Sequence, residues 1–327
     1  MNSDFKAYLL EATQATECEE VEIIQSLWSG YGKIIRYGLQ GCSRKTVVVK
    51  SISLKETGSH PYGWTGEISH KRKVKSYEIE RNWYQDWSSA CNLDCRVPEF
   101  IGFFAQGKDE YIIMEDLDAE FPIRKASVNL EELKACLSWL ANFHARFMQE
   151  SPKGLWKEGT YWHLDTRPEE LESIEDLELK NKAPKIDALL RECHHQTILH
   201  GDAKLANFCF SKNGREVAAV DFQYVGGGCG MKDLAYFLGS CLPESDLFEL
   251  EEDLLNFYFQ ELKMALRRLN ENRNGSLLDF DELEGEWRRM YPLAWADFLR
   301  FLLGWKPNHE KINSFSLEKL KAVLETI

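Results

Sequence analysis

The sequence predicts an α+β protein in which a small, strand-rich first part precedes a larger, mostly helical second part. Runs of β-branched and alternating apolar residues fill much of 21–53, a pattern typical of strands. From Leu130 onward apolar residues recur about every 3.6 positions, as in amphipathic helices. The character of the chain changes near residues 114–119. We therefore expect one part over 1–117 and the other over 118–327.

The pattern also predicts the order of elements. In the first part we expect strands at 21–27, 33–39, 46–52, 99–104 and 110–114, a short helix at 4–15 and one prominent helix at 67–88. Turn-forming residues at 58–63 predict a loop before the prominent helix. In the second part we expect helices at 130–148, 168–179, 184–193, 232–241, 245–270, 281–303 and 315–326. One strand at 216–222, with a short partner at 207–211, interrupts them.

Composition narrows the classes of function. The chain has 327 residues, 44% hydrophobic and 28% charged, which is ordinary for a globular protein and excludes collagen or wholesale disorder. No apolar run approaches the roughly 20 residues of a membrane span. The net charge of −13 argues against a nucleic-acid partner. Nine scattered cysteines and no secretory signal indicate a reducing, cytoplasmic location.

One motif carries recognisable chemistry. The pattern H-G-D-x-x-x-x-N places Asp202 and Asn207 on one loop, and Asp221 follows a short apolar run. Phosphoryl transfer needs a carboxylate near the acceptor hydroxyl and oxygen ligands for Mg²⁺. Asp202 can accept the proton of the hydroxyl, while Asn207 and Asp221 can ligate the metal. Lys204 can reach the transferring phosphoryl group, or it is an ordinary exposed lysine. A single Asp or Asn is usually a cap or turn residue, so the joint spacing carries the prediction.

These residues resemble the small-molecule branch of the protein-kinase-like fold, which includes aminoglycoside phosphotransferases, choline and ethanolamine kinases and ecdysteroid kinase-like proteins. The resemblance rests on residues 200–207, on Asp221-Phe222-Gln223 and on the run Asp-Leu-Ala-Tyr-Phe-Leu at 233–238. Residues 140–145 resemble the helix beneath the catalytic loop. The resemblance implies two lobes, a nucleotide-binding N-lobe with a small antiparallel sheet and one main helix, and a helical C-lobe that binds the acceptor.

The same resemblance assigns an ion pair. In such families a lysine on the third strand binds the α- and β-phosphates of the nucleotide and pairs with a helix glutamate. Lys50 matches the lysine, and Glu80 matches the glutamate, with Glu78 as the other choice. A carboxylate across the cleft can hold a cation on a rigid strand. The alternative for Lys50 is an edge-strand lysine that blocks aggregation.

Further nucleotide contacts follow from the resemblance. The backbones of Glu115 and Leu117 would hydrogen-bond adenine at the hinge between the lobes. Gly30 and Gly32, in the segment 29–33, would lie in the loop that covers the nucleotide, because glycines permit close backbone approach to phosphate. The segment lacks the full G-x-G-x-x-G, and a simple hairpin turn is the alternative.

Some residues near the motif have other expected roles. His200 is expected to brace the loop, and Asp233 to satisfy backbone donors at the start of a helix. The glycines at 226–230 predict a mobile loop or a phosphate cradle. Trp162 and Trp295 are candidates for an aromatic acceptor pocket, or for the core.

The sequence therefore predicts a kinase that uses ATP and Mg²⁺ to phosphorylate a hydroxyl of a small-molecule acceptor. Glycine replaces the arginine that protein kinases carry between the motif His and Asp, and no Ala-Pro-Glu follows, which disfavours a protein substrate. The second part, with a net charge near −10, favours an amine-bearing acceptor such as choline or an aminoglycoside, unless the charges are merely solvated helix faces. A steroid-like alcohol or a sugar stays open. The alternative function is a nucleotide-binding regulator without turnover.

Overall fold

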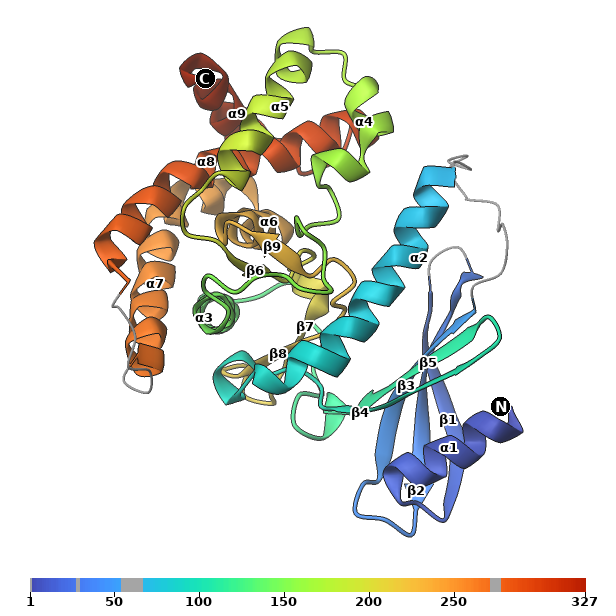
Figure 1. Cartoon of the computed structure of the whole chain (residues 1–327). Coiled ribbons are helices and arrows are strands. Elements are labelled where there is room, and N and C mark those ends of the chain that lie inside the picture. The colour runs from blue at the N-terminus through green and yellow to red at the C-terminus, as the bar shows by residue number, and fades with distance from the viewer. Residues whose placement is uncertain (1, 28–29, 54–66, 271–277) are drawn as a thin grey trace.

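A five-stranded antiparallel sheet forms the first part of the chain in the computed structural model, which describes residues 2–27, 30–53, 67–270 and 278–327 (Figure 1). The strand order is β1-β2-β3-β5-β4. The strands are β1 (Glu17–Ser26), β2 (Gly32–Gln40), β3 (Thr46–Ser53), β4 (Phe100–Gln106) and β5 (Asp109–Glu115). The five predicted strands are confirmed, whereas the turn predicted at 58–63 lies outside the described residues.

Two helices cover the two faces of this sheet, as the alternation of side chains along β3 requires. Val47 and Val49 pack with Phe5 of α1 (Ser3–Thr13), whereas Ile52 packs toward α2 (Glu67–Asn82). The prominent helix continues past Asn82 as a π-helical turn, Trp83–Trp87. Lys50, between Val49 and Ile52, therefore faces α2.

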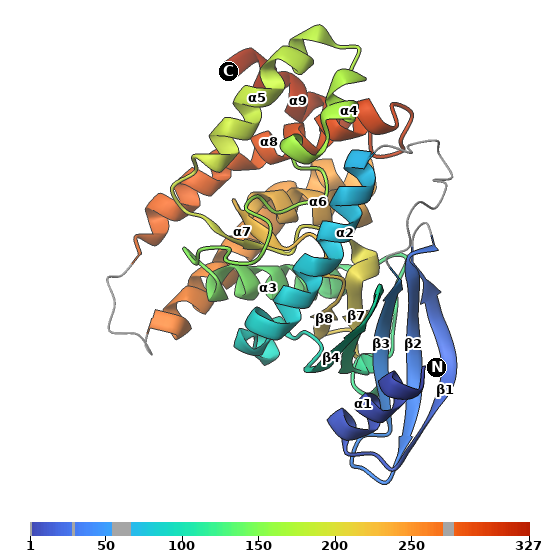
Figure 2. The ribbon, with the colours of Figure 1, turned by 45° about the vertical axis from the view of Figure 1, so that its right-hand side comes forward.

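The second part is mostly helical, as predicted. Its helices are α3 (Leu130–Arg146), α4 (Pro168–Glu172), α5 (Leu177–Arg191), α6 (Met231–Cys241), α7 (Glu244–Asn270), α8 (Phe280–Trp305) and α9 (Ser314–Thr326). Asn129 and Glu132 form a capping box that starts α3. The N-terminus lies beside the sheet and the C-terminus at the opposite end (Figures 1 and 2). Within the described ranges, every helix is too short or too polar to reach across a bilayer.

The helix boundaries between 168 and 193 differ from the prediction. The expected helix 168–179 ends at Glu172, and the one expected from 184 already begins at Leu177. The Asp176 side chain accepts the backbone N–H of Leu179 and so caps a new helix. Pro184 lies inside that helix rather than at its start.

Four short strands surround the predicted catalytic loop. They are β6 (Thr197–Leu199), β7 (Phe208–Phe210), β8 (Val217–Ala219) and β9 (Gly226–Gly228). The predicted pairing of 207–211 with 216–222 is confirmed over the shorter β7 and β8. The prediction of a mobile loop at 226–230 is wrong, because Gly226–Gly228 form a strand that pairs with β6. A Cβ on Gly226 would lie 2.4 Å from the Trp156 carbonyl oxygen, so close backbone packing explains the glycines.

Candidate active site

Lys50 joins the sheet, α2 and the segment after β8 through a chain of charges. Because β3 lies between β2 and β5, Lys50 is not on a sheet edge, and the aggregation-blocking alternative is wrong. Its Nζ donates to Glu80 Oε2 at 2.6 Å and to Asp221 Oδ1 at 3.3 Å. Glu78 instead bonds Lys75 on the surface. Burial lowers the pKa of Lys50, but Glu80 and Asp221 outweigh it, so the pKa is raised and the ammonium keeps its charge.

Contacts with Tyr224 and Asp233 fix the backbone of the predicted catalytic loop. Gly201 has φ of +78°, and a Cβ there would lie 2.0 Å from the Tyr224 carbonyl oxygen, so only glycine fits. The Asp233 carboxylate accepts the backbone N–H of His200 at 2.6 Å and of Gly201 at 2.9 Å. Asp233 thus satisfies backbone donors, as expected, but those of the loop rather than those at the start of its own helix, α6.

His200 braces the same loop. Its Nδ1 accepts the backbone N–H of Asp202 at 3.2 Å, and its Nε2 lies 3.1 Å from the Val220 carbonyl oxygen. These partners require an acceptor at Nδ1 and a proton at Nε2, which is the neutral ring. Burial lowers the pKa of His200 despite nearby carboxylates, in agreement with that form. The expected bracing role is therefore confirmed.

Asp202 is the best-connected side chain of the loop. Its Oδ1 accepts the Tyr236 hydroxyl at 3.0 Å. Its Oδ2 accepts Lys204 Nζ at 2.8 Å and Asn207 Nδ2 at 3.1 Å. Burial lowers the pKa of Lys204, but Asp202 outweighs burial, so the pKa is raised. Lys204 is accordingly an ion-pair partner of Asp202 that lines the same cavity.

Asn207 and Asp221 come together through the backbone. The N–H of Val220 donates to the Asn207 carbonyl at 3.0 Å, which sets the next residue, Asp221, beside the loop. Asp221 has φ of +69°, a left-handed conformation that a non-glycine residue rarely adopts and that is often found at functional sites. Burial raises the pKa of Asp221, but Lys50 and then Lys204 outweigh it and lower the pKa to about 2.

The oxygens of Asn207 and Asp221 suit a divalent cation. The Asn207 amide nitrogen donates to Asp202, which leaves its Oδ1 for another partner. In the described part of the chain, no three His, Cys, Asp or Glu side chains gather to hold a metal alone. Mg²⁺ commonly takes one or two protein oxygens and completes its shell with phosphates and water. The residues present therefore fit Mg²⁺ bound together with a nucleotide.

One cavity of about 1140 Å³ unites most of the predicted site. The predicted residues that line it are Lys50, Glu80, Glu115, Leu117, Asp202, Lys204, Asn207 and Asp221. Of the described residues in 29–33, Tyr31 lines the cavity and the predicted Gly30 and Gly32 do not; Ser29 lies outside the described residues. A Cβ on Gly32 would lie 1.9 Å from the Ser51 carbonyl oxygen, so this glycine permits strand packing.

The hinge segment carries ion pairs that the sequence did not reveal. The Glu115 N–H donates to the Glu99 carbonyl at 2.9 Å, and its side chain accepts from Arg96. Asp116 accepts from Arg36 Nε at 2.6 Å and thereby ties the hinge to β2. The acidic residues within 115–118 were the only sequence feature that could have indicated these ion pairs. Adenine binding by the backbones of 115 and 117 stays a prediction.

The wall beyond Asp202 differs from the aromatic pocket that was expected. Trp162 and Trp295 are buried in the core, and neither lines the cavity. The aromatic lining there is instead Tyr161, Tyr224, Tyr236, Phe301 and Trp305. Two arginines, Arg72 and Arg167, also line it. Only Tyr236 had a sequence signal, since it lies within the motif at 233–238.

Comparisons with known proteins agree with this geometry. Residues 158–271 match the model of the ecdysteroid kinase-like family. No curated protein sequence compared with the chain matches it. Among solved structures, an ethanolamine kinase from Plasmodium vivax aligns with a TM-score of 0.50 and 12% identity, over 94% of this chain and 82% of that one.

Two aminoglycoside phosphotransferases align with lower TM-scores. An aminoglycoside phosphotransferase from Streptomyces rimosus, solved with ADP and streptomycin, gives a TM-score of 0.47 and 14% identity over 90% of this chain and 100% of that one. An aminoglycoside-3'-phosphotransferase of type VIII gives a TM-score of 0.45 and 17% identity, over 87% of this chain and 98% of that one. The family match confirms the resemblance around the catalytic loop, and the ethanolamine kinase structure confirms the protein-kinase-like fold.

Proposed function

We propose that this chain is a small-molecule kinase that transfers the γ-phosphoryl group of ATP to a hydroxyl of its acceptor. The observation that carries the proposal is the meeting of Asp202, Asn207, Asp221 and Lys50 in one cavity. The family match over 158–271 and the kinase-like fold support it. On this proposal the N-lobe, 1–117, holds the nucleotide and the C-lobe, 118–327, holds the acceptor.

The nucleotide is bound mainly from the N-lobe. Lys50 contacts the α- and β-phosphates, and Glu80 holds the ammonium in place at 2.6 Å. The backbones of Glu115 and Leu117 bind adenine at the hinge. Asn207 Oδ1 and the Asp221 carboxylate hold Mg²⁺, which offsets the phosphate charge and orients the γ-phosphoryl group when it is bound.

Asp202 acts on the acceptor. Its carboxylate orients the hydroxyl and accepts its proton as the oxygen bonds to the γ-phosphorus and the bond from that phosphorus to the β-γ bridging oxygen breaks. The products are ADP, the phosphate ester and one proton. Lys204 offsets charge on the transferring group, and Tyr236 fixes the carboxylate orientation. Catalysis on this proposal is mostly positioning and charge stabilisation.

A radiolabel-transfer assay tests the proposal. The full chain is given Mg²⁺, γ-labelled ATP and a panel of amino alcohols, aminoglycosides, sugars and sterols, and label is sought in the acceptor. Ethanolamine belongs in the panel because a structural neighbour is an ethanolamine kinase. We expect transfer that Asp202→Asn abolishes while nucleotide binding persists. A D202N protein with full turnover would refute the assignment, and nucleotide binding without transfer to any acceptor would favour the non-catalytic regulator.

A further inference from the structure

Arg72 and Arg167 line the same cavity as Asp202. Arg167 is reached from Asp202 through a chain of contacts: the Tyr236 hydroxyl bonds Asp202 at 3.0 Å, and the Tyr236 and Tyr161 ring centroids lie 5.6 Å apart. The Tyr161 carbonyl then accepts Arg167 Nε at 2.6 Å. Arg72, on α2, reaches the same region. Its Nη1 donates to the backbone carbonyl of Thr166 at 2.6 Å.

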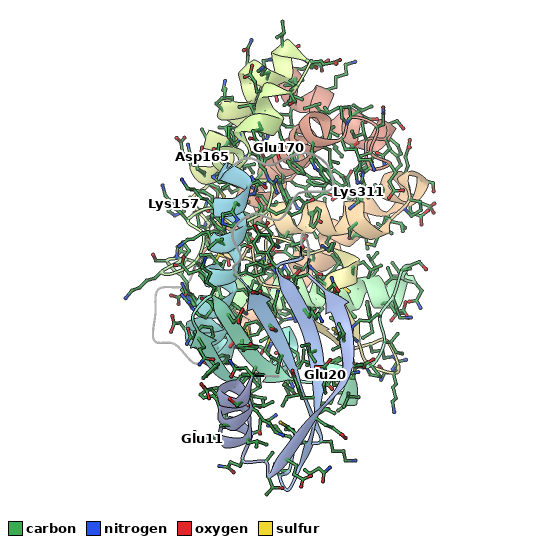
Figure 3. All side chains as sticks on the ribbon, turned by 90° about the vertical axis from the view of Figure 1, so that its right-hand side faces the viewer. Glu11, Glu20, Lys157, Asp165, Glu170 and Lys311 are labelled. Carbon is green, nitrogen blue, oxygen red and sulfur yellow. The ribbon has the colours of Figure 1, made fainter. Side chains whose placement is uncertain are left out.

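The two guanidiniums have few carboxylate partners. Within the described part of the chain, Arg72 has no Asp or Glu oxygen at ion-pair distance, and its bonds go to the Thr166 carbonyl and the Ser69 hydroxyl. Arg167 pairs with the buried Glu170 at 2.9 Å. Figure 3 shows Glu170 beside the N-terminal end of α2. Glu170 thus contacts only Arg167, and the positive charge of Arg72 at this end of the cavity has no contacting carboxylate among the described residues.

The environment of Arg72 is unfavourable for an unpaired charge. Burial lowers the pKa of Arg72, and the nearby Arg167 lowers it further, while Glu170 and Glu169 offset these effects only in part. A partly desolvated guanidinium gains most from an anionic oxygen group, which it can bind through two parallel hydrogen bonds. The protein itself supplies no such group to Arg72 within the described residues.

The phosphates of the nucleotide are served by other cations. Lys50, Lys204 and Lys73 are the lysines whose charges lower the pKa of Asp221. Lys50 bonds Asp221 and Lys73 bonds Gln223, whereas Arg72 bonds the carbonyl of Thr166, next to Arg167. Arg72 and Arg167 therefore belong to the acceptor end of the cavity rather than to the metal end.

An ammonium group is poorly matched to this end. Cations bind well over aromatic faces, but the Arg167 guanidinium already lies 5.0 Å from the Phe301 ring centroid and 5.8 Å from that of Tyr161. Phe301 in turn stacks on Trp305 with centroids 5.6 Å apart. The rings offer apolar surface to a carbon skeleton, and the arginines offer charge to an anion.

We propose, on the basis of the proposed function, that the acceptor is an alcohol with an apolar skeleton that also carries an anionic oxygen group, bound by Arg72 and Arg167. A sulfate, phosphate or carboxylate group meets this description. The aromatic wall of Tyr161, Phe301 and Trp305 holds the skeleton.

Binding of matched probes tests this proposal without turnover. The probes share a 2-(2-naphthyl)ethanol skeleton, which is left neutral or carries sulfonate, phosphonate, carboxylate or trimethylammonium at ring position 6. Calorimetry with the full chain and saturating Mg-ADP measures each Kd. We expect at least one anionic probe to bind about tenfold or more tightly than the neutral alcohol, and the ammonium probe to bind no better than the neutral one.

Variants assign the preference to the arginines. Arg72→Gln and Arg167→Gln should each weaken the preferred anionic probe about tenfold and leave the neutral alcohol within about threefold, while Arg72→Lys retains part of the preference. The control Arg44→Gln, at a surface arginine that bonds Glu99, should change nothing. Anionic probes no tighter than the neutral one, or a preference that survives both Gln variants, would overturn the inference. The comparison of anionic and neutral probes uses the unmodified protein, so it remains valid even if a variant fails to fold. Absence of phosphoryl transfer would overturn only the proposed function.

Discussion

The Lys50 ammonium lies 3.3 Å from the Asp221 carboxylate, although 171 residues separate them in the chain. This pair links the central strand of the sheet to the segment that follows β8, and Glu80 holds it from α2. The cavity is therefore closed on one side by a charge network rather than by apolar packing alone. Removing Lys50 should therefore weaken nucleotide binding and also lower the stability of the fold, because Glu80 would stay buried without its cation.

On the proposed function, Lys50→Met should weaken Mg-ATP binding by about tenfold or more, because the phosphates would lose a charge-assisted partner. Calorimetry or fluorescence titration with Mg-ATP measures the effect. Lys45→Met, at an exposed lysine just before the same strand, is the matched control and should bind normally. Equal affinities for the two variants would remove Lys50 from the nucleotide site.

Tyr236→Phe should lower kcat about tenfold and leave the Kd for Mg-ADP unchanged. The substitution keeps the ring and removes only the hydroxyl that bonds Asp202 at 3.0 Å, so the carboxylate loses one constraint on its orientation. Steady-state kinetics, once an acceptor is found, separate kcat from KM. Tyr8→Phe removes a hydroxyl bonded to the Phe103 N–H beside α1 and serves as the control. An unaltered kcat in Y236F would argue against a positioning role.

Gly201→Ala should destabilise the protein more than Gly107→Ala does. Both glycines have positive φ, +78° and +63°, so both alanines incur a backbone cost of roughly 1–2 kcal/mol. Only at Gly201 would the added Cβ collide, 2.0 Å from the Tyr224 carbonyl oxygen, whereas Gly107 has nothing within 4 Å. Urea unfolding gives the two free energies of unfolding. Similar losses would mean that the loop can move away from Tyr224 at little cost.

Asp297→Asn should lower the free energy of unfolding by about 3–5 kcal/mol, because Lys232 and Arg300 would keep buried charges without their carboxylate. Asp253→Asn, at an exposed aspartate of α7, is the control and should cost little. Urea denaturation near neutral pH compares the two. A loss in D297N no larger than in D253N would contradict the expectation.

The same aspartate predicts how stability depends on pH. Burial raises the pKa of Asp297, but Lys232 and then Arg300 outweigh it, so the pKa falls from an ordinary 3.8 to about 2. The unfolded chain therefore binds the proton more readily, and this stabilisation is complete above pH 3.8 and lost as the pH falls through about 2. The stability of wild type should drop more steeply in that interval than that of D297N. Parallel curves would exclude this linkage.

The sequence predicted those features that depend on local pattern. The period of 130–148 and the alternation of 46–52 each follow from one buried face, so α3 and β3 appear where expected. The spacing of Asp202, Asn207 and Asp221 was also readable, because a loop and the strand that follows it bring those residues together, although Asp233 of α6 fixes the loop backbone.

The remaining features depend on partners that lie far apart in the chain. Nothing local shows that Trp162 bonds the buried Asp297, which draws it into the core rather than the pocket. Similarly, the acidic balance of the second part gave no sign of Arg72, which reaches the cavity wall beside Thr166 from α2 in the first part. Total charge cannot report on one cavity wall, since most of the acidic side chains lie elsewhere on the surface.

The strand Gly226–Gly228 has a consequence for how this protein can diverge. Cβ atoms there would lie 2.4 Å from the Trp156 carbonyl oxygen, 2.8 Å from that of Lys157 and 2.5 Å from Leu199 Cδ1. This glycine-rich segment, whose sequence resembles a flexible linker, is thus among the positions least able to accept a side chain. In a library of all single substitutions, these three positions should tolerate replacement about as poorly as the centre of α3, and far less well than the solvent-facing positions of α7.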